Sequence, residues 1–134
     1  MEKTNIKQIL TKKKNGTLCT SKPEQQSYEI LKVKYPDIIS QYCCVLYPYN
    51  CDFYIPSLDL YIECNYHWTH GGRPFDDKNI NDLNILEKWK SKNTEFYNTA
   101  IYVWSNLDVR KRETARKNNL NYIEVWTIND IYNI

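Results

Sequence analysis

The chain has 134 residues, of which 42% are hydrophobic and 25% are charged. A chain of this length can bury roughly two-thirds of its unfolded surface in one core without disulfide or metal staples. It contains no run of about 18 apolar residues that could span a membrane, and its lysine-containing start lacks the apolar segment of a signal peptide. We therefore expect a soluble, cytoplasmic protein with no membrane partner.

The numbers of cysteines, glycines and prolines exclude several further classes of protein. The five cysteines are an odd number without a C-x-x-C pair, so we interpret them as reduced thiols. Three glycines and five prolines exclude collagen-like and low-complexity chains.

The charges are sorted along the chain. Residues 1–34 hold eight lysines against three glutamates, residues 35–87 hold eight acids against two basic residues, and residues 88–134 hold eight basic residues against five acids. An acidic centre between basic flanks suits a metal-assisted enzyme that acts on a polyanion, because carboxylates hold the cation and basic residues hold phosphates. The alternative is that the charges merely cluster on solvated faces.

In chain order, the first predicted element is a basic arm over residues 1–20, which includes Lys12, Lys13 and Lys14. One folded domain over residues 21–134 follows it. Its first helix begins at Ser21-Lys22-Pro23-Glu24, with serine as the cap, proline in the first turn and glutamate closing a capping box. The helix should end near Lys34, because the residue before Pro36 is disfavoured in a helix.

Three short extended segments come next, at residues 41–47, 51–55 and 58–65, and they are predicted to form a meander. A helix is predicted over residues 80–92, with an inner row of Ile80, Leu83, Leu86 and Trp89. The remaining predictions are a strand at 99–104, a basic helix at 107–118 that opens on a second capping box at Ser105 to Asp108, and a strand at 122–127. This order of elements gives a mixed sheet with helices on its faces.

Three acidic residues are the first candidates for chemistry. On its helix, Glu24 shares a side with Tyr28 and Leu31, so it should point at the sheet; the alternative is that it only completes the capping box. Asp52 and Glu63 lie eleven residues apart on the two arms of a hairpin. Antiparallel pairing brings such positions together.

Two adjacent carboxylates repel, which raises one pKa or recruits a cation. Mg²⁺ fits best, because it takes hard oxygen ligands from one or two acids, waters and a phosphate. The alternative is that Asp52 and Glu63 are exposed acids on a half-solvated sheet.

The stretch from Tyr61 to Gly71 contains both histidines of the chain, His67 and His70. A histidine beside a metal site can accept a proton from an attacking water or give one to a leaving oxygen. A zinc site is the alternative, built from Cys64, His67 and His70 with Cys51 or Cys43. We discount it because Cys64 lies on the opposite face of its strand from Glu63.

Three motifs together resemble the PD-(D/E)xK nuclease superfamily, and within it the very short patch repair endonucleases and related phage homing endonucleases. They are Ser21-x-x-Glu24, Asp52-Phe53-Tyr54-Ile55-Pro56 and Ile62-Glu63-Cys64-Asn65-Tyr66-x-Trp68-x-His70. The resemblance covers roughly residues 21–127. It implies an α/β fold with a restriction-endonuclease-like core and a four-stranded mixed sheet flanked by helices, which we expect in the order αβββαβαβ.

The resemblance also implies a function: a Mg²⁺-dependent DNA endonuclease of homing or repair type, of the kind that phages and mobile elements encode. Asp52 and Glu63 resemble the metal ligands, with Mn²⁺ expected to replace Mg²⁺, and Glu24 resembles the helix glutamate. His67 and His70 resemble the histidines that flank the metal-bound water. Trp68 resembles a signature tryptophan, and Asp76 or Asp77 a late aspartate.

The sequence also departs from the family pattern. Asn65 replaces the lysine of the superfamily motif and cannot supply its positive charge. Asn65 would then only steady the nucleophile, while a histidine does the work of the lysine. This departure favours an alternative, a catalytically inactive nucleic-acid-binding or inhibitory protein on the same fold. A small zinc-stabilised interaction module is a third possibility.

As a nuclease the chain should bind DNA as a monomer or homodimer. Trp68 could stack on or wedge between bases, and basic residues should contact phosphates. The candidate phosphate contacts are Lys12, Lys13, Lys14, Arg73, Arg110, Lys111, Arg112, Arg116 and Lys117. For the helical residues among them, the alternative is an ordinary solvated surface whose cations favour the helix dipole.

Overall fold

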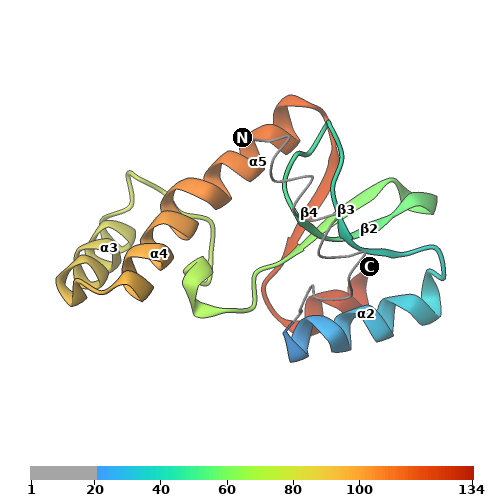
Figure 1. Cartoon of the computed structure of the whole chain (residues 1–134), viewed down its shortest axis with the longest axis horizontal. Coiled ribbons are helices and arrows are strands. Elements are labelled where there is room, and N and C mark those ends of the chain that lie inside the picture. Colours follow the sequence, from blue (N-terminus) through green and yellow to red (C-terminus); the bar gives the residue numbers. More distant parts are fainter. Residues whose placement is uncertain (1–20) are drawn as a thin grey trace. The chain divides into compact units, whose positions relative to one another are not determined.

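A computed structural model describes residues 21–134 (Figure 1). Residues 1–20, with the predicted basic arm and its candidates Lys12, Lys13 and Lys14, lie outside the described residues. The chain forms two compact units. Of the described residues, the first unit contains 21–66 and 114–134, and the second contains 67–113.

The first helix, α2 (Lys22–Lys34), begins and ends where the sequence predicts. The Ser21 side chain caps it and accepts a hydrogen bond from the Glu24 amide at 3.4 Å, and proline occupies the first turn. Local capping chemistry therefore determines both the start of this helix and the position of Glu24 on it.

The first unit is built on a four-stranded mixed sheet in the order β1-β2-β3-β4. The strands are β1 (Ile39–Tyr42), β2 (Cys51–Ile55), β3 (Leu60–Cys64) and β4 (Asn121–Val125). The pairs β1–β2 and β2–β3 are antiparallel, and β3–β4 is parallel. The predicted α/β fold with a four-stranded mixed sheet flanked by helices is confirmed.

Each face of this sheet has its own apolar cluster. Helix α2 lies along one side of the strands (Figure 1) and contributes Leu31 to a core with Phe53, Ile55 and Ile62. On the other face, Ala115 from α5 (Asp108–Lys117) packs with a group of tyrosines that includes Tyr47 and Tyr61. Of the carboxylates described below, Asp52 and Glu63 lie on the strands between these two layers, and Glu24 lies on α2.

The prediction for the first strand is wrong beyond Tyr42. The strand ends there instead of at Tyr47, and residues 43–50 form a loop. Tyr47 is nevertheless fully buried, so burial of an aromatic ring in a loop produced the apolar pattern that resembled a strand.

The prediction of a strand at residues 99–104 is also wrong. Helix α4 (Glu95–Tyr102) occupies this region and continues through a π-helical turn, Val103–Leu107, into α5. Ala100 and Trp104 are both fully buried and lie four residues apart, which is the helical period. The predicted order αβββαβαβ is therefore replaced by αβββαααβ.

The second predicted capping box, at Ser105 to Asp108, is wrong for the same reason. Ser105 lies inside the continuous helical segment, and its hydroxyl donates to the Ile101 carbonyl at 2.6 Å. The helix starts further upstream, where the Thr94 side chain accepts a hydrogen bond from the Tyr97 amide.

Helix α3 (Ile80–Lys92) has the predicted bounds, but its inner row is only partly right. Leu86 and Trp89 are buried, whereas Ile80 and Leu83 are exposed. Asp82 is buried in their place. Within residues 21–134, none of the helices is both long and apolar enough to cross a membrane.

Candidate active site

Asp52 and Glu63 lie on the adjacent strands β2 and β3, as the predicted hairpin requires. The Asp52 amide donates a hydrogen bond to Glu63 Oε1 at 3.1 Å, and the Cys64 amide donates to Asp52 Oδ2 at 2.7 Å. Each carboxylate therefore accepts a main-chain hydrogen bond from the neighbouring strand. These two contacts fix both acids next to the β2–β3 ladder.

Glu63 is a buried acid, with only 3% of the residue exposed. The Tyr47 hydroxyl donates to Glu63 Oε2 at 2.6 Å, and the Tyr47 ring is fully buried. Burial, and then the charge of Glu63, raises the pKa of Tyr47 well above its usual value. Tyr47 therefore stays protonated and remains a hydrogen-bond donor to this carboxylate. Sequence analysis assigned no role to Tyr47.

The third acid, Glu24, reaches the same region from α2. Gln41 Nε2 donates to Glu24 Oε2 at 3.1 Å. Burial raises the pKa of Glu24 above its usual value; hydrogen bonds with Asp52 and Gln41 act in the opposite direction, and the charge of Glu63 raises it further. The prediction that Glu24 faces the sheet is confirmed, and its carboxylate contacts Gln41 on β1 and Asp52 on β2.

The chemistry of this donor set fits a hard divalent cation. Asp52 and Glu63 lie on adjacent strands, and Glu24 interacts with both; a cation or a proton relieves the repulsion between neighbouring carboxylates. Mg²⁺ commonly takes only one or two protein carboxylates and completes its shell with water and phosphate, so Asp52 and Glu63 suffice as ligands. Within residues 21–134, no group of three or more His, Cys, Asp and Glu side chains is arranged to hold a metal ion.

The cysteines do not fit the alternative zinc site. Burial is the main factor that raises the pKa of the Cys64 thiol, and it does the same for Cys43. In the part of the chain that the structure describes, no cysteine joins two other His, Cys, Asp or Glu side chains in a group that could hold a metal ion. Cys43, Cys44, Cys51 and Cys64 are all free thiols.

Asn65, which the sequence resemblance would place at the lysine of the superfamily motif, is buried directly after β3. Its Nδ2 donates to Glu124 Oε1 at 3.1 Å. Glu124 lies on β4 directly beside Glu63 in the parallel register. Sequence analysis missed Glu124, although a glutamate inside an otherwise apolar strand is a signal that could have pointed to it.

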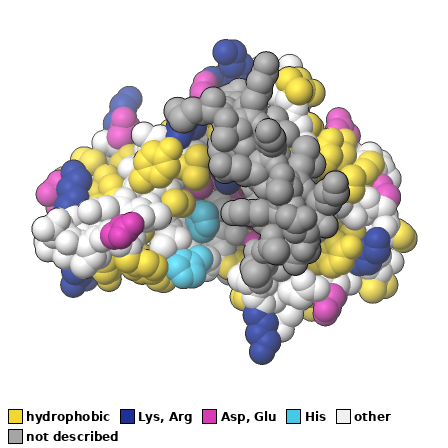
Figure 2. Space-filling view, in the orientation of Figure 1, with side chains coloured by type: hydrophobic (Ala, Val, Ile, Leu, Met, Phe, Trp, Pro, Cys, Tyr) yellow, Lys and Arg dark blue, Asp and Glu magenta, His cyan; other side chains and the backbone are white. Residues whose placement is uncertain are grey.

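Both histidines belong to the second unit, and Figure 2 shows them in cyan at the surface. His67 caps the short 3-10 helix η2 (Trp68–His70): its Nδ1 accepts a hydrogen bond from the Thr69 amide and lies 2.9 Å from Thr69 Oγ1. One ring nitrogen of His67 is therefore committed to local structure.

His70 has a different partner. Its Nδ1 lies 2.6 Å from Oδ2 of Asp108, whose side chain is only 3% exposed. An acidic partner at Nδ1 places the ring proton there and leaves Nε2 free to accept a proton. Sequence analysis treated Asp108 only as part of a helix cap, and the pair joins residues 38 positions apart.

Gly71 fixes the chain directly after His70. It adopts φ +74°, and a Cβ at this position would lie 2.1 Å from the Trp104 ring. Only glycine tolerates both this left-handed conformation and this close approach. Gly71 therefore determines where η2 ends and how His70 is presented.

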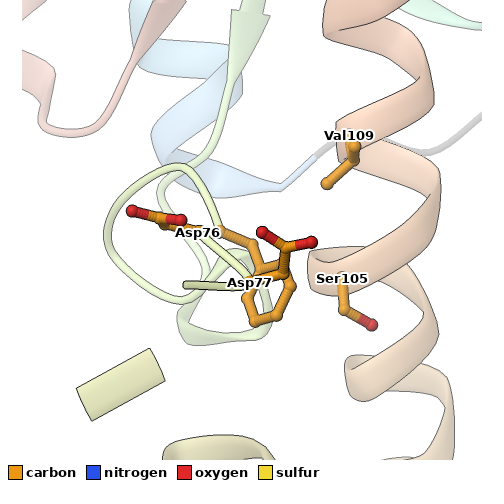
Figure 3. A pocket seen from close by; sticks show the side chains of 5 residues that line it. Asp76, Asp77, Ser105 and Val109 are labelled. Atoms are coloured by element: carbon orange, nitrogen blue, oxygen red, sulfur yellow. The ribbon is translucent and has the colours of Figure 1, made fainter. Parts of the chain in front are cut away.

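The aspartates Asp76 and Asp77, which resemble a late family aspartate, line a pocket of about 330 Å³ with Phe75, Ser105 and Val109. In Figure 3 the Asp77 carboxylate points toward the helical segment that carries Ser105 and Val109, and the Asp76 carboxylate points away from it. Asp76 Oδ1 accepts a hydrogen bond from the Lys78 amide.

Arg73 and Arg110, two of the predicted phosphate contacts, have the following intramolecular partners. Arg73 Nη2 lies 3.7 Å from Oδ2 of buried Asp82. Arg110 donates to Asn106 Oδ1 and to the Tyr102 hydroxyl, over whose ring it stacks. Of the remaining candidates on α5, Lys111 and Arg112 are half-buried, and Arg116 and Lys117 are exposed.

Trp68 is 41% exposed and packs into a cluster of aromatic rings. Its ring centroid lies 5.3 to 5.4 Å from those of Trp89, Phe96 and Tyr97. Part of the predicted base-stacking surface is therefore used for packing, and part remains accessible.

Comparisons of the chain with protein-family models, with curated proteins and with solved structures gave no significant match. The function is therefore inferred from the residues and contacts described above.

Proposed function

We propose that the protein is a divalent-cation-dependent DNA endonuclease with a restriction-endonuclease-like core. One observation carries this proposal: the Asp52 and Glu63 carboxylates lie on the adjacent strands β2 and β3, each accepting a hydrogen bond from a main-chain amide of the other strand, and Glu24 from α2 lies beside Asp52. The order of a helix, an antiparallel meander and a later parallel strand agrees with the core that the sequence resemblance implies, and it supports the proposal.

Asp52 and Glu63 would hold Mg²⁺ or Mn²⁺, each with a carboxylate already oriented by a main-chain amide. When bound, the cation supplies Lewis-acid polarisation of the scissile phosphate and lowers the pKa of a coordinated water. Glu24, beside Asp52, orients the attacking water or Asp52 itself. Asn65, whose amide is anchored on Glu124, steadies the nucleophile.

Proton transfer is assigned to His70 on the chemistry of that residue. Asp108 holds the proton on Nδ1, so that Nε2 can accept a proton or return one to the leaving oxygen. His67 is the weaker candidate, because its Nδ1 already caps η2.

DNA phosphates would be held by the basic residues of α5, of which Arg116 and Lys117 are exposed, and by the predicted lysine arm. Trp68 offers a partly exposed aromatic ring to the bases. Arg73 and Arg110 are further candidates, and each would exchange an intramolecular partner for phosphate.

A second candidate is a nucleic-acid-binding or inhibitory protein that retains the fold without cleavage. The specific observation in its favour is that Asn65 stands in the lysine position, is buried, and uses its amide on Glu124. Such a site offers no positive side chain to a phosphate or to a developing hydroxide.

A plasmid assay separates the two candidates. The purified protein is incubated with supercoiled DNA in Mg²⁺, in Mn²⁺ and in EDTA, beside the Asp52→Ala and Glu63→Ala variants. The nuclease produces nicked or linear DNA only with a cation, and both variants lose this activity while still retarding DNA in a gel. Retardation without nicking by the wild-type protein supports the second candidate, and cleavage retained in both variants excludes the proposed site.

A further inference from the structure

Gln41 has an unusual backbone conformation inside a paired strand. Its φ is +58°, in the left-handed region that non-glycine residues rarely adopt. Its neighbours Ser40 and Tyr42 keep their pairing with Phe53 and Cys51 on β2. Such a conformation persists only where the surrounding structure holds it, and it occurs preferentially at functional sites.

The Gln41 side chain is buried and hydrogen-bonded at both ends. Its Nε2 donates to Glu24 Oε2, and its Oε1 accepts from Asn50 Nδ2. A carboxylate can only accept, so the NH₂ end of the amide must face Glu24. The donor from Asn50 then satisfies the carbonyl end, and the amide has a single consistent orientation.

Glu24 in turn lies beside Asp52 and interacts with its carboxyl group. The chain therefore runs from Asn50 through Gln41 and Glu24 to an acid that is a ligand in the proposed function. The Gln41 amide thus orients one oxygen of this carboxylate, Oε2, from the side of β1.

We propose that Gln41, oriented by Asn50, is a positioning residue that holds the Glu24 carboxylate against Asp52. This inference rests on the proposed nuclease function and adds a residue to it. It also gives a reason for the left-handed backbone, because the conformation of Gln41 accompanies a side chain directed toward α2 rather than toward solvent. Residues that orient the groups around a metal without binding it themselves typically contribute 10- to 100-fold to metal affinity or activity.

The first test is Gln41→Met. Methionine keeps the length of the side chain and pays the same energetic cost for a positive φ, but it removes both amide hydrogen bonds. Gln26→Met, at an exposed position on α2, is the matched control. We expect the single-turnover cleavage rate at saturating Mg²⁺ to fall about tenfold or more in Gln41→Met. The KM for DNA and the rates of the control should stay at wild-type values.

The second test needs neither metal nor activity. Urea unfolding in EDTA is measured for the wild-type protein, Gln41→Met, Glu24→Ala and the double variant. If Gln41 acts through Glu24, the double variant has a smaller shift in unfolding midpoint than the two single shifts together. Fully additive shifts contradict the contact.

These tests separate this inference from the proposed function. If wild-type protein cleaves DNA and Gln41→Met cleaves at the same rate, the role of Gln41 is wrong and the nuclease stands. If the wild-type protein does not cleave with either cation, the proposed function is wrong, and the positioning role fails with it.

Discussion

The Nδ1 atom of His70 lies 2.6 Å from Oδ2 of Asp108, a carboxylate that is almost completely buried. This contact distinguishes the two histidines of the chain, because the corresponding atom of His67 caps η2 through the Thr69 amide. A histidine whose Nδ1 contacts an acid has Nε2 as the ring nitrogen that can exchange a proton with a substrate.

The first prediction follows from this difference. His70→Gln should lower the rate of Mg²⁺-dependent DNA cleavage by about 10²-fold or more, because positioned acid–base groups typically contribute 10²–10⁴-fold. His67→Gln should lower it far less. Single-turnover plasmid cleavage measures both rates.

Asp108→Asn extends the same test. The amide keeps the shape of the side chain but no longer fixes the tautomer of the His70 ring, so cleavage should slow. Far-UV circular dichroism controls for folding of α5. Equal activity of His70→Gln and wild-type protein is incompatible with the assignment of His70.

A second prediction concerns the hydroxyl of Tyr47, which donates to buried Glu63. Tyr47→Phe leaves a buried carboxylate oxygen without this donor and should lower the free energy of unfolding by about 1.5–3 kcal/mol. Tyr132→Phe, at an exposed position, should change it by less than about 0.5 kcal/mol. Urea unfolding followed by circular dichroism measures the difference, and equal stabilities of the two variants contradict the role given to Tyr47.

A third prediction uses the raised pKa of Glu24. The pKa of Glu24 in the folded protein lies above the ordinary value of 4.5 that applies to the unfolded chain. At a pH between the unfolded and the folded pKa, the folded protein therefore binds more protons than the unfolded chain does. Stability therefore falls as the pH rises through this window. Glu24→Gln cannot ionise, so its thermal midpoint should exceed that of wild-type protein at pH 8, and the difference should shrink as the pH falls to 4.5.

Glu29→Gln, at an exposed position on the same helix, is the control and should track the wild-type protein at every pH. Thermal unfolding in a series of buffers from pH 4 to pH 8 provides the comparison. A Glu24→Gln midpoint below that of wild-type protein at pH 8 is the opposite of the expected sign.

A fourth prediction separates the energetic cost of a positive φ from the cost of a steric clash, at two neighbouring glycines. Gly71→Ala must accept a positive φ and a Cβ within 2.1 Å of the Trp104 ring, whereas Gly72→Ala has φ +75° and no atom within 4 Å of its Cβ. The first substitution should destabilise by about 2–4 kcal/mol, and the second by about 1 kcal/mol. Chemical unfolding followed by tryptophan fluorescence measures both values. Similar losses in the free energy of unfolding would mean that the Trp104 ring moves aside without cost, which contradicts the prediction.

Sequence reasoning succeeded where the signal was local. The bounds of α2 follow from Ser21 and Pro23 at its start and Pro36 beyond its end. The alternation of side chains along two paired strands placed Asp52 and Glu63 side by side. It failed at residues 99–104, because a run of apolar and β-branched residues fits a strand or a buried helix until Ala100 and Trp104 are seen to share one helical face.

The contacts that complete the candidate sites were beyond a reading of the sequence. The pairing of His70 with Asp108 joins distant positions through tertiary packing. The role of Gln41 depends on a positive φ that nothing in its sequence neighbourhood encodes, since glutamine is not a residue that favours this region.

The most direct test of the account is a crystal structure of the protein grown with Mn²⁺, with anomalous scattering used to locate the ion. The account predicts an anomalous peak that is coordinated by carboxylate oxygens of both Asp52 and Glu63, and that disappears in Asp52→Ala. Manganese bound elsewhere on the molecule, with these two carboxylates left uncoordinated, would contradict it.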